Sequence, residues 1–219
     1  MGEIDLYEAM RSLRAVRRLR PDPVPEPALR RALEAATFAP TGGNAQPWRA
    51  IVVRERELMA RLGALYAERW AAYAVGHKRL LASAPAEAVA RAEKMLAAGD
   101  HLAAHFADTP VLVIFCFDPT RMAITDAKLG RVSVVGGASV YPSVQNFLLA
   151  CRAEGLGCVL TTLLCEVEPE VRALLEIPEP WATACAIPVG WPLARGHGPL
   201  SRRPMAKMAF GDRFGRPFA

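Results

Sequence analysis

Hydrophobic residues recur along the chain at two spacings, which together predict helices interspersed with strands. After the proline-rich stretch Arg20–Pro27, alanines and leucines repeat every three or four positions until Pro40. This spacing predicts a buried helix with a sharp end. The short apolar runs Ala50–Val53 and Val111–Phe117 are bounded by turn residues. Runs of this kind are typical of buried strands.

The middle of the chain returns to helical spacing. Apolar positions from Leu58 to Phe106 predict two or more helices, which Ala84-Pro85 interrupts. A further helix carries Val144 and Cys151, begins or kinks at Pro142, and ends at Gly155, a typical residue for a helix C-terminus.

The last apolar runs predict two more strands, Cys158–Leu163 and Ala184–Val189, and after Gly190 the chain becomes irregular. Strands interspersed with uneven helical blocks predict an α+β layer fold and not a doubly wound sheet. No linker divides the chain, so residues 1–219 are expected to form a single domain. Because the tail cannot close a core by itself, we expect it to lie across a partner in an obligate homodimer.

Composition narrows the class of protein. Hydrophobic residues make up 52% and charged residues 22%, which is typical of a globular chain. The longest apolar run, Val111–Phe117, has seven residues, whereas a membrane-spanning helix needs about 20. No export signal is visible, and the five cysteines contain no C-x-x-C pair, which predicts buried thiols in the cytoplasm.

The net charge of +5 is unevenly distributed, since five arginines lie within residues 11–20. Such a cluster suits nucleic acid, a membrane surface or one small phosphate-bearing ligand. Residues 11–20 contain no aromatic side chain that could stack on bases, so nucleic-acid binding is not favoured.

Several familiar motifs are absent. Gly155-Leu156-Gly157 precedes a predicted strand, whereas a dinucleotide-binding fingerprint follows one. His101 and His105 have no third ligand at a suitable spacing, so no metal site is expected. The sequence also lacks a phosphate-binding P-loop and a nucleophilic serine motif, and a catalytic cysteine is not favoured.

Three segments remain, and their order is informative: Leu13–Arg18, Ala39–Trp48 and Ser201–Pro204. Together they resemble the FMN-dependent nitroreductase family, whose members open with R-R-S-x-R, continue with A-P-S-x-x-N-x-Q-P-W, and close with a basic residue two before a proline. The helix and turn from Gln145 to Gly157 also resemble that family, so the similarity spans residues 5 to about 204.

The resemblance implies a three-layer fold with a mixed central sheet flanked by helices. It also implies that an extended C-terminal arm crosses to the dimer partner, and that FMN lies at the subunit interface.

The arginines are suited to bind the phosphate of FMN, which carries about two negative charges. Because the sequence has no P-loop, side chains must neutralise these charges. Arg14 and Arg17 are three residues apart and are expected on one face at the end of the first helix, while Arg202 returns from the tail. The alternative is that these arginines form a solvated surface.

Family similarity assigns finer roles. Arg17 corresponds to the cation near flavin N1 and the C2 carbonyl, and Asn44 to an amide at the pyrimidine edge. The loop beneath the ring is matched by Pro40, Thr41, Gly42 and Asn44. The stretch whose backbone N–H groups face flavin N5 and O4 is matched by Leu160, Thr161, Thr162 and Leu163. Alternatively, the two threonines merely suit a strand, or their hydroxyls favour one-electron chemistry as in the related iodotyrosine deiodinases.

Two positions depart from the family pattern. Leu13 stands where an arginine is usual, and Ala15 replaces a serine within the cofactor-binding run. Arg18 or Arg203 is a candidate to compensate for the missing phosphate contacts.

The resemblance further implies the reaction. NADH or NADPH passes hydride to flavin N5, and a nitroaromatic or quinone then takes the electrons at the same ring face, so no side chain acts as nucleophile or general base. The segment Ala64–Ala82, with Tyr66, Trp70 and Tyr73, is expected to form a lid or else part of the core. Three alternatives stay open: a specialised dehalogenase or oxidase of the same fold, a flavin carrier without turnover, and a basic nucleic-acid binder.

Overall fold

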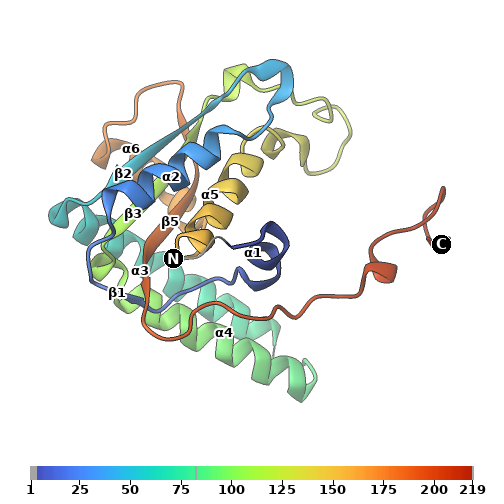
Figure 1. The fold of residues 1–219 in the computed structure, drawn as a ribbon, viewed down its shortest axis with the longest axis horizontal. Coiled ribbons are helices and arrows are strands. Elements are labelled where there is room, and N and C mark those ends of the chain that lie inside the picture. Colours follow the sequence, from blue (N-terminus) through green and yellow to red (C-terminus); the bar gives the residue numbers. More distant parts are fainter. Residues whose placement is uncertain (1–3, 82, 219) are drawn as a thin grey trace.

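The computed structural model describes residues 4–81 and 83–218, and its centre is a five-stranded sheet (Figure 1). The strands are β1 (Leu19–Arg20), β2 (Trp48–Val53), β3 (Val111–Phe117), β4 (Gly157–Cys158) and β5 (Ala182–Pro192). Their order is β1-β5-β3-β2, and β4 also pairs with β5. All of these pairings are antiparallel. The prediction of a mixed sheet is therefore wrong for these strands, and among the described residues parallel pairing is limited to an isolated bridge between Ala15 and Cys158.

Helices cover both faces of the sheet. They are α1 (Leu6–Ser12), α2 (Glu26–Thr37), α3 (Arg56–Leu80), α4 (Ala86–Ala104), α5 (Tyr141–Ala153) and α6 (Glu168–Leu174). One hydrophobic cluster joins α2 and α5 to the sheet, and a second joins α3, α4 and α6 to it. The α+β prediction is confirmed, and the sheet is the middle of three layers.

The central strand β3 shows why three layers form. Val113 and Phe115 pack in the cluster with α2 and α5, whereas Leu112 and Ile114 pack in the cluster with α3 and α4. Successive side chains of a strand point to opposite faces, so a continuous apolar run needs cover on both sides. The ring of Phe115 meets Phe147 of α5 edge to face, with centroids 5.7 Å apart.

The predicted strand Cys158–Leu163 is largely wrong. The strand ends at Cys158, Thr161 makes one isolated bridge to Ala186, and a 3-10 turn begins at Leu163. The physical reason lies at Thr162, whose φ of −113° and ψ of 4° turn the backbone out of the sheet. After the bridge at Thr161, residues 162 and 163 therefore turn away from β5 instead of continuing beside it.

The long helical region is divided as predicted, because α3 ends at Leu80 and α4 begins directly after Pro85. In the described ranges, no helix combines the length and apolarity needed to cross a membrane.

The C-terminal tail leaves the body of the molecule (Figure 1). Residues 201–208 are all exposed, and Phe214 near the end is 95% exposed. The crossing of this arm to a dimer partner stays a prediction.

Candidate functional site

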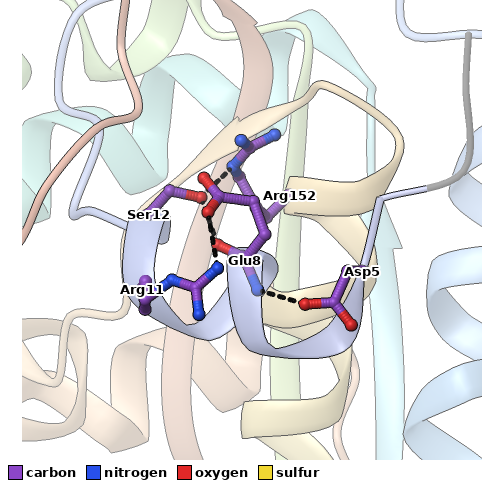
Figure 2. A network of polar contacts seen from close by, with 5 residues as sticks. All are labelled: Asp5, Glu8, Arg11, Ser12 and Arg152. Atoms are coloured by element: carbon purple, nitrogen blue, oxygen red, sulfur yellow. Dashed lines mark hydrogen bonds and ion pairs between the residues drawn. The ribbon is translucent and has the colours of Figure 1, made fainter.

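The arginine segment starts from an anchored helix, α1. Asp5 caps the helix by accepting the N–H of Glu8 at 3.0 Å, and Ser12 Oγ donates to the Glu8 carbonyl at 2.6 Å (Figure 2). Arg152 of α5 donates from Nε to Ser12 Oγ at 2.9 Å. This network fixes the last turn of α1 against α5.

Arg14 and Arg17 do not share a helical face. α1 ends at Ser12, and Leu13 has an extended backbone with ψ of 115°. Residues three apart on an extended segment point to opposite sides. Accordingly Arg14 is exposed whereas Arg17 is half-buried, so the prediction of one helical face is wrong.

The extended segment lies against β4. The N–H of Val16 donates to the Cys158 carbonyl at 2.9 Å. Gly157 makes this approach possible, because a Cβ there would lie 2.8 Å from Cγ1 of Val16. The contact holds Arg17 beside the bend that follows Cys158.

The tail runs back along the same segment. Leu193 N–H donates to the Arg18 carbonyl at 2.9 Å, and Gly198 N–H donates to the Ser12 carbonyl at 3.1 Å. Arg195 and Arg202 thereby come to α1, where they help to line a cavity of about 740 Å³. Arg203 is exposed beside Arg202. The tail therefore reaches α1, but neither Arg14 nor Arg17 lines this cavity, so the convergence of Arg14, Arg17 and Arg202 on one phosphate stays a prediction.

A second cavity of about 200 Å³ joins Arg17 to the bend after β4, and we call it the Arg17 cavity. Its walls are formed by Arg17, Tyr66, Trp70, Tyr73, Met95, Val159, Leu160, Thr161, Thr162 and Leu163. Within the described residues, the N–H of Thr162 has no hydrogen-bond partner, and that of Leu163 has only the long 3.5 Å contact to Thr161 Oγ1. The bend therefore offers backbone donors to a ligand.

The electrostatics of the site suit an anion. No carboxylate in residues 4–81 and 83–218 pairs with Arg14, Arg17, Arg202 or Arg203. Burial raises the pKa of Tyr66 in the Arg17 cavity, while hydrogen bonding to Thr161 and the charge of Arg17 oppose that shift. The Tyr66 phenol thus stays protonated and uncharged beside a cation.

The aromatic side chains of α3 divide between core and surface. Tyr66 is 2% and Trp70 7% exposed, whereas Tyr73 is 43% exposed. Trp70 Nε1 donates to Asp100 Oδ1 at 2.7 Å, and its ring lies where a side chain at Gly99 would be. Trp70 therefore holds α3 to α4, and Tyr66 stacks on Phe106, so both are core residues.

The loop of Pro40, Thr41, Gly42 and Asn44 lies elsewhere. Gly42 N–H donates to Ser139 Oγ at 3.1 Å, just before α5 begins, and Asn44 adopts a left-handed φ of 52°. The arginine segment contacts the other end of α5 through Ser12 and Arg152. Since α5 has 13 residues, the two ends are about 20 Å apart. Within one chain, the loop Pro40–Asn44 therefore does not lie near Arg14.

A cavity of about 440 Å³, which contains Ile124, Tyr141 and Thr162, was not predicted from the sequence. Met95 of the Arg17 cavity was not predicted either. These residues come together only through long-range packing, and the sequence contains no spacing signal that would have grouped them.

The cysteines are inert thiols. Cys116, Cys151, Cys158 and Cys185 are buried and Cys165 is partly buried, all of them unpaired. Burial raises the pKa of Cys116 to about 11, which disfavours the nucleophilic thiolate.

Comparison with known proteins places this geometry in a family. The family model described as "Nitroreductase family" matches residues 10–191. The chain is 30% identical over 212 residues to a protein of Thermus thermophilus named NADH dehydrogenase, covering 94% of this chain and 95% of that one. It is also 30% identical over 205 residues to a 5,6-dimethylbenzimidazole synthase of Rhodobacter capsulatus, covering 90% and 88% of the two chains.

A solved structure shares the fold. It is a protein of Desulfovibrio desulfuricans in complex with FMN, with a TM-score of 0.65 and 23% identity over 97% of this chain and 99% of that chain. The family model covers most of the chain, and the full-length relatives and the shared fold agree with it. The chain therefore belongs to the nitroreductase family.

Proposed function

We propose that this flavin oxidoreductase binds FMN and transfers hydride from NADH or NADPH to electron-poor acceptors such as nitroaromatics or quinones. The observation that carries the proposal is the Arg17 cavity, where a guanidinium, the residues Leu160–Leu163 and the unpaired N–H of Thr162 meet. A flavin ring presents both features that such a cavity can recognise, a polar pyrimidine edge and a hydrogen-bond-accepting N5.

The residues present fit the cofactor. Arg14, Arg202 and Arg203, which have no carboxylate partner in the described part of the chain, are suited to hold the phosphate. Ala15 has no polar side chain, so its role is its backbone bridge to Cys158, which positions the arginine segment. Arg17 would meet the pyrimidine edge.

The N–H groups of Thr162 and Leu163 would hold flavin N5 and O4 in place. FMN, when bound, supplies the reversible acceptance of a hydride. The balanced reaction with a quinone consumes one NAD(P)H and one proton, and yields NAD(P)⁺ and the hydroquinone.

A second copy of the chain would complete the site. The loop Pro40–Asn44 and the arginine segment of the same chain contact opposite ends of α5, and the length of this helix separates those ends by about 20 Å. The tail carries apolar side chains that its own chain leaves exposed, among them Met208, Phe214 and Phe218. A homodimer in which the arm crosses over and the loop reaches the other subunit's flavin accounts for both features.

The test compares two arginine variants of one segment. Arg17→Ala should weaken FMN binding about 10- to 150-fold, because a charge-assisted hydrogen bond contributes about 1.5–3 kcal/mol. Arg20→Ala is the matched control, since Arg20 is exposed and pairs with Asp22. FMN affinity is measured by titration of the apoprotein with absorbance detection. Equal affinities of the two variants would show that Arg17 does not contact the flavin.

One observation favours a second candidate, a specialised reaction of the same fold. Thr161 and Thr162 place hydroxyl groups at the bend, and one full-length relative is named 5,6-dimethylbenzimidazole synthase. Anaerobic addition of NADPH to the yellow protein separates the two candidates. Bleaching of the flavin band supports the general reductase, whereas a band that persists supports the specialised enzyme or a carrier.

A further inference from the structure

The cavity that contains Ile124, Tyr141 and Thr162 directly adjoins the proposed flavin site, and we call it the Tyr141 cavity. Its volume of about 440 Å³ falls in the range of about 300–1,000 Å³ typical of small-molecule sites. Thr162 lines both this cavity and the Arg17 cavity. A ligand in the Tyr141 cavity would therefore lie at the same backbone bend that faces the flavin.

The walls of the Tyr141 cavity present mainly apolar atoms. Phe117, Met122, Ile124 and Val140 contribute side chains, and none of the described residues that line it is charged. The Arg17 cavity on the other side of Thr162 differs, because it contains a guanidinium.

Apart from Thr162, whose unpaired N–H is assigned to the flavin, the hydroxyl groups in these walls already have partners. The Tyr141 hydroxyl donates to the Ala184 carbonyl at 3.3 Å, and the Thr183 hydroxyl donates to Glu168 at 2.7 Å. Ser133 Oγ donates to Asp126 at 2.6 Å. A ligand gains little from polar contacts with these groups, while a charged ligand would lose its hydration without compensation.

One wall of the Tyr141 cavity is formed by a loop that hydrogen bonds hold in place. Asp126 is 4% exposed and accepts hydrogen bonds from Ser133 Oγ, from Arg131 and from the N–H of Val134. These contacts hold the loop that carries Met122 and Ile124 over the cavity. Gly137 completes the shape, since a Cβ there would lie 2.8 Å from the Tyr141 ring.

From these observations we propose that the Tyr141 cavity binds the electron acceptor and selects uncharged aromatic compounds, with Ile124 and Met122 as specificity-determining residues. The proposal rests on the proposed function, because the acceptor is defined by the flavin beside it. It assigns the Arg17 cavity to the cofactor and the Tyr141 cavity to the second substrate.

The test uses two ligands that differ in charge, nitrobenzene and 4-nitrobenzoate. Each is titrated calorimetrically into the oxidised FMN-loaded protein without NAD(P)H, so that binding is measured in the absence of turnover. The wild-type protein should bind nitrobenzene at least about tenfold more tightly, a difference of about 1.4 kcal/mol. Tighter binding of 4-nitrobenzoate would place the acceptor beside Arg17 and overturn the proposal.

Two variants of the loop that carries Met122 and Ile124 locate the ligand. Ile124→Asp puts a carboxylate in the cavity wall and should raise the dissociation constant of nitrobenzene about tenfold, because the ring loses apolar contact and meets a charge. Val132→Asp is the matched control, since Val132 is 87% exposed and lies outside the cavity lining. It should bind nitrobenzene like the wild type. Ile124 is itself 40% exposed, so the substitution is compatible with folding.

The affinity for FMN separates the remaining outcomes. If Ile124→Asp binds nitrobenzene as the wild type does while FMN remains bound, the acceptor lies elsewhere and this inference fails alone. If Ile124→Asp instead weakens FMN binding, the cavity holds part of the flavin and the inference is again wrong. A wild-type protein that does not bind FMN contradicts the proposed function itself.

Discussion

The contact between Gly157 and the arginine segment links the stability of the fold to its chemistry. Gly157 is buried in β4, and a Cβ at that position would lie 2.8 Å from Val16 Cγ1, 2.9 Å from Leu19 Cδ2 and 3.0 Å from Val16 Cβ. Real Cβ atoms do not approach other atoms this closely, so Gly157→Ala must displace Val16 or the strand. Because Val16 is bonded to Arg17 in the chain, the cation should move with it.

The magnitude follows from the cost of overpacking a well-packed interior, about 1–3 kcal/mol for one extra methyl group. In a chain of this size each kcal/mol lowers the melting temperature by about 2–4 °C. Gly157→Ala is therefore expected to melt several degrees below the wild type and to bind FMN more weakly. Thermal unfolding followed by circular dichroism and FMN titration measure the two effects.

The control is the same substitution at a glycine with space around it. Gly76 lies within α3, and a methyl group added there would have open space within 4 Å. Gly76→Ala should stabilise the protein by about 0.5–1 kcal/mol through the better helix propensity of alanine. A Gly157→Ala protein that melts at the wild-type temperature would refute the reasoning, since it would show that Val16 is not packed against β4.

Three further predictions concern other parts of the molecule. Trp70→Phe removes the hydrogen bond to Asp100, and urea unfolding should show a loss of about 1.5–3 kcal/mol; an unchanged midpoint would mean that the bond contributes nothing. Burial and the neighbouring Arg152 lower the pKa of His197, so the folded protein favours the neutral imidazole. The contribution of this imidazole to stability is complete above about pH 6.5, the ordinary pKa of histidine, and is lost as the pH falls below that value. The melting temperature should therefore decrease less between pH 7.5 and pH 5 in His197→Gln than in the wild type, and an equal decrease would contradict this. Removal of residues 204–219 should convert the proposed dimer to monomers in analytical ultracentrifugation, whereas a dimer that persists would show that the arm does not hold it together.

Some elements of the fold could be predicted because local sequence decides them. The strand Val111–Phe117 matches its predicted bounds, since a seven-residue apolar run lies between Pro110 and Pro119. The break before α4 was equally predictable from Pro85. In these places the local preference and the tertiary packing agree.

Other elements depend on partners far along the chain. The arginine segment leaves the helix at Leu13 because Ser12 is fixed by Arg152 and Val16 pairs with Cys158. The bend at Thr162 likewise follows from its surroundings, as two threonines within an apolar run would otherwise favour a strand. The sequence therefore identified Arg17 and Leu160–Leu163 as candidates, but their meeting in one cavity required the structure.

The most direct test of the account is a crystal structure of the protein with FMN. Arg17 and the N–H groups of Thr162 and Leu163 should contact the flavin from one chain, while the loop Pro40–Asn44 of the partner subunit should contact the same flavin. A flavin bound away from Arg17, or one reached by both sets of residues from a single chain, would contradict this prediction.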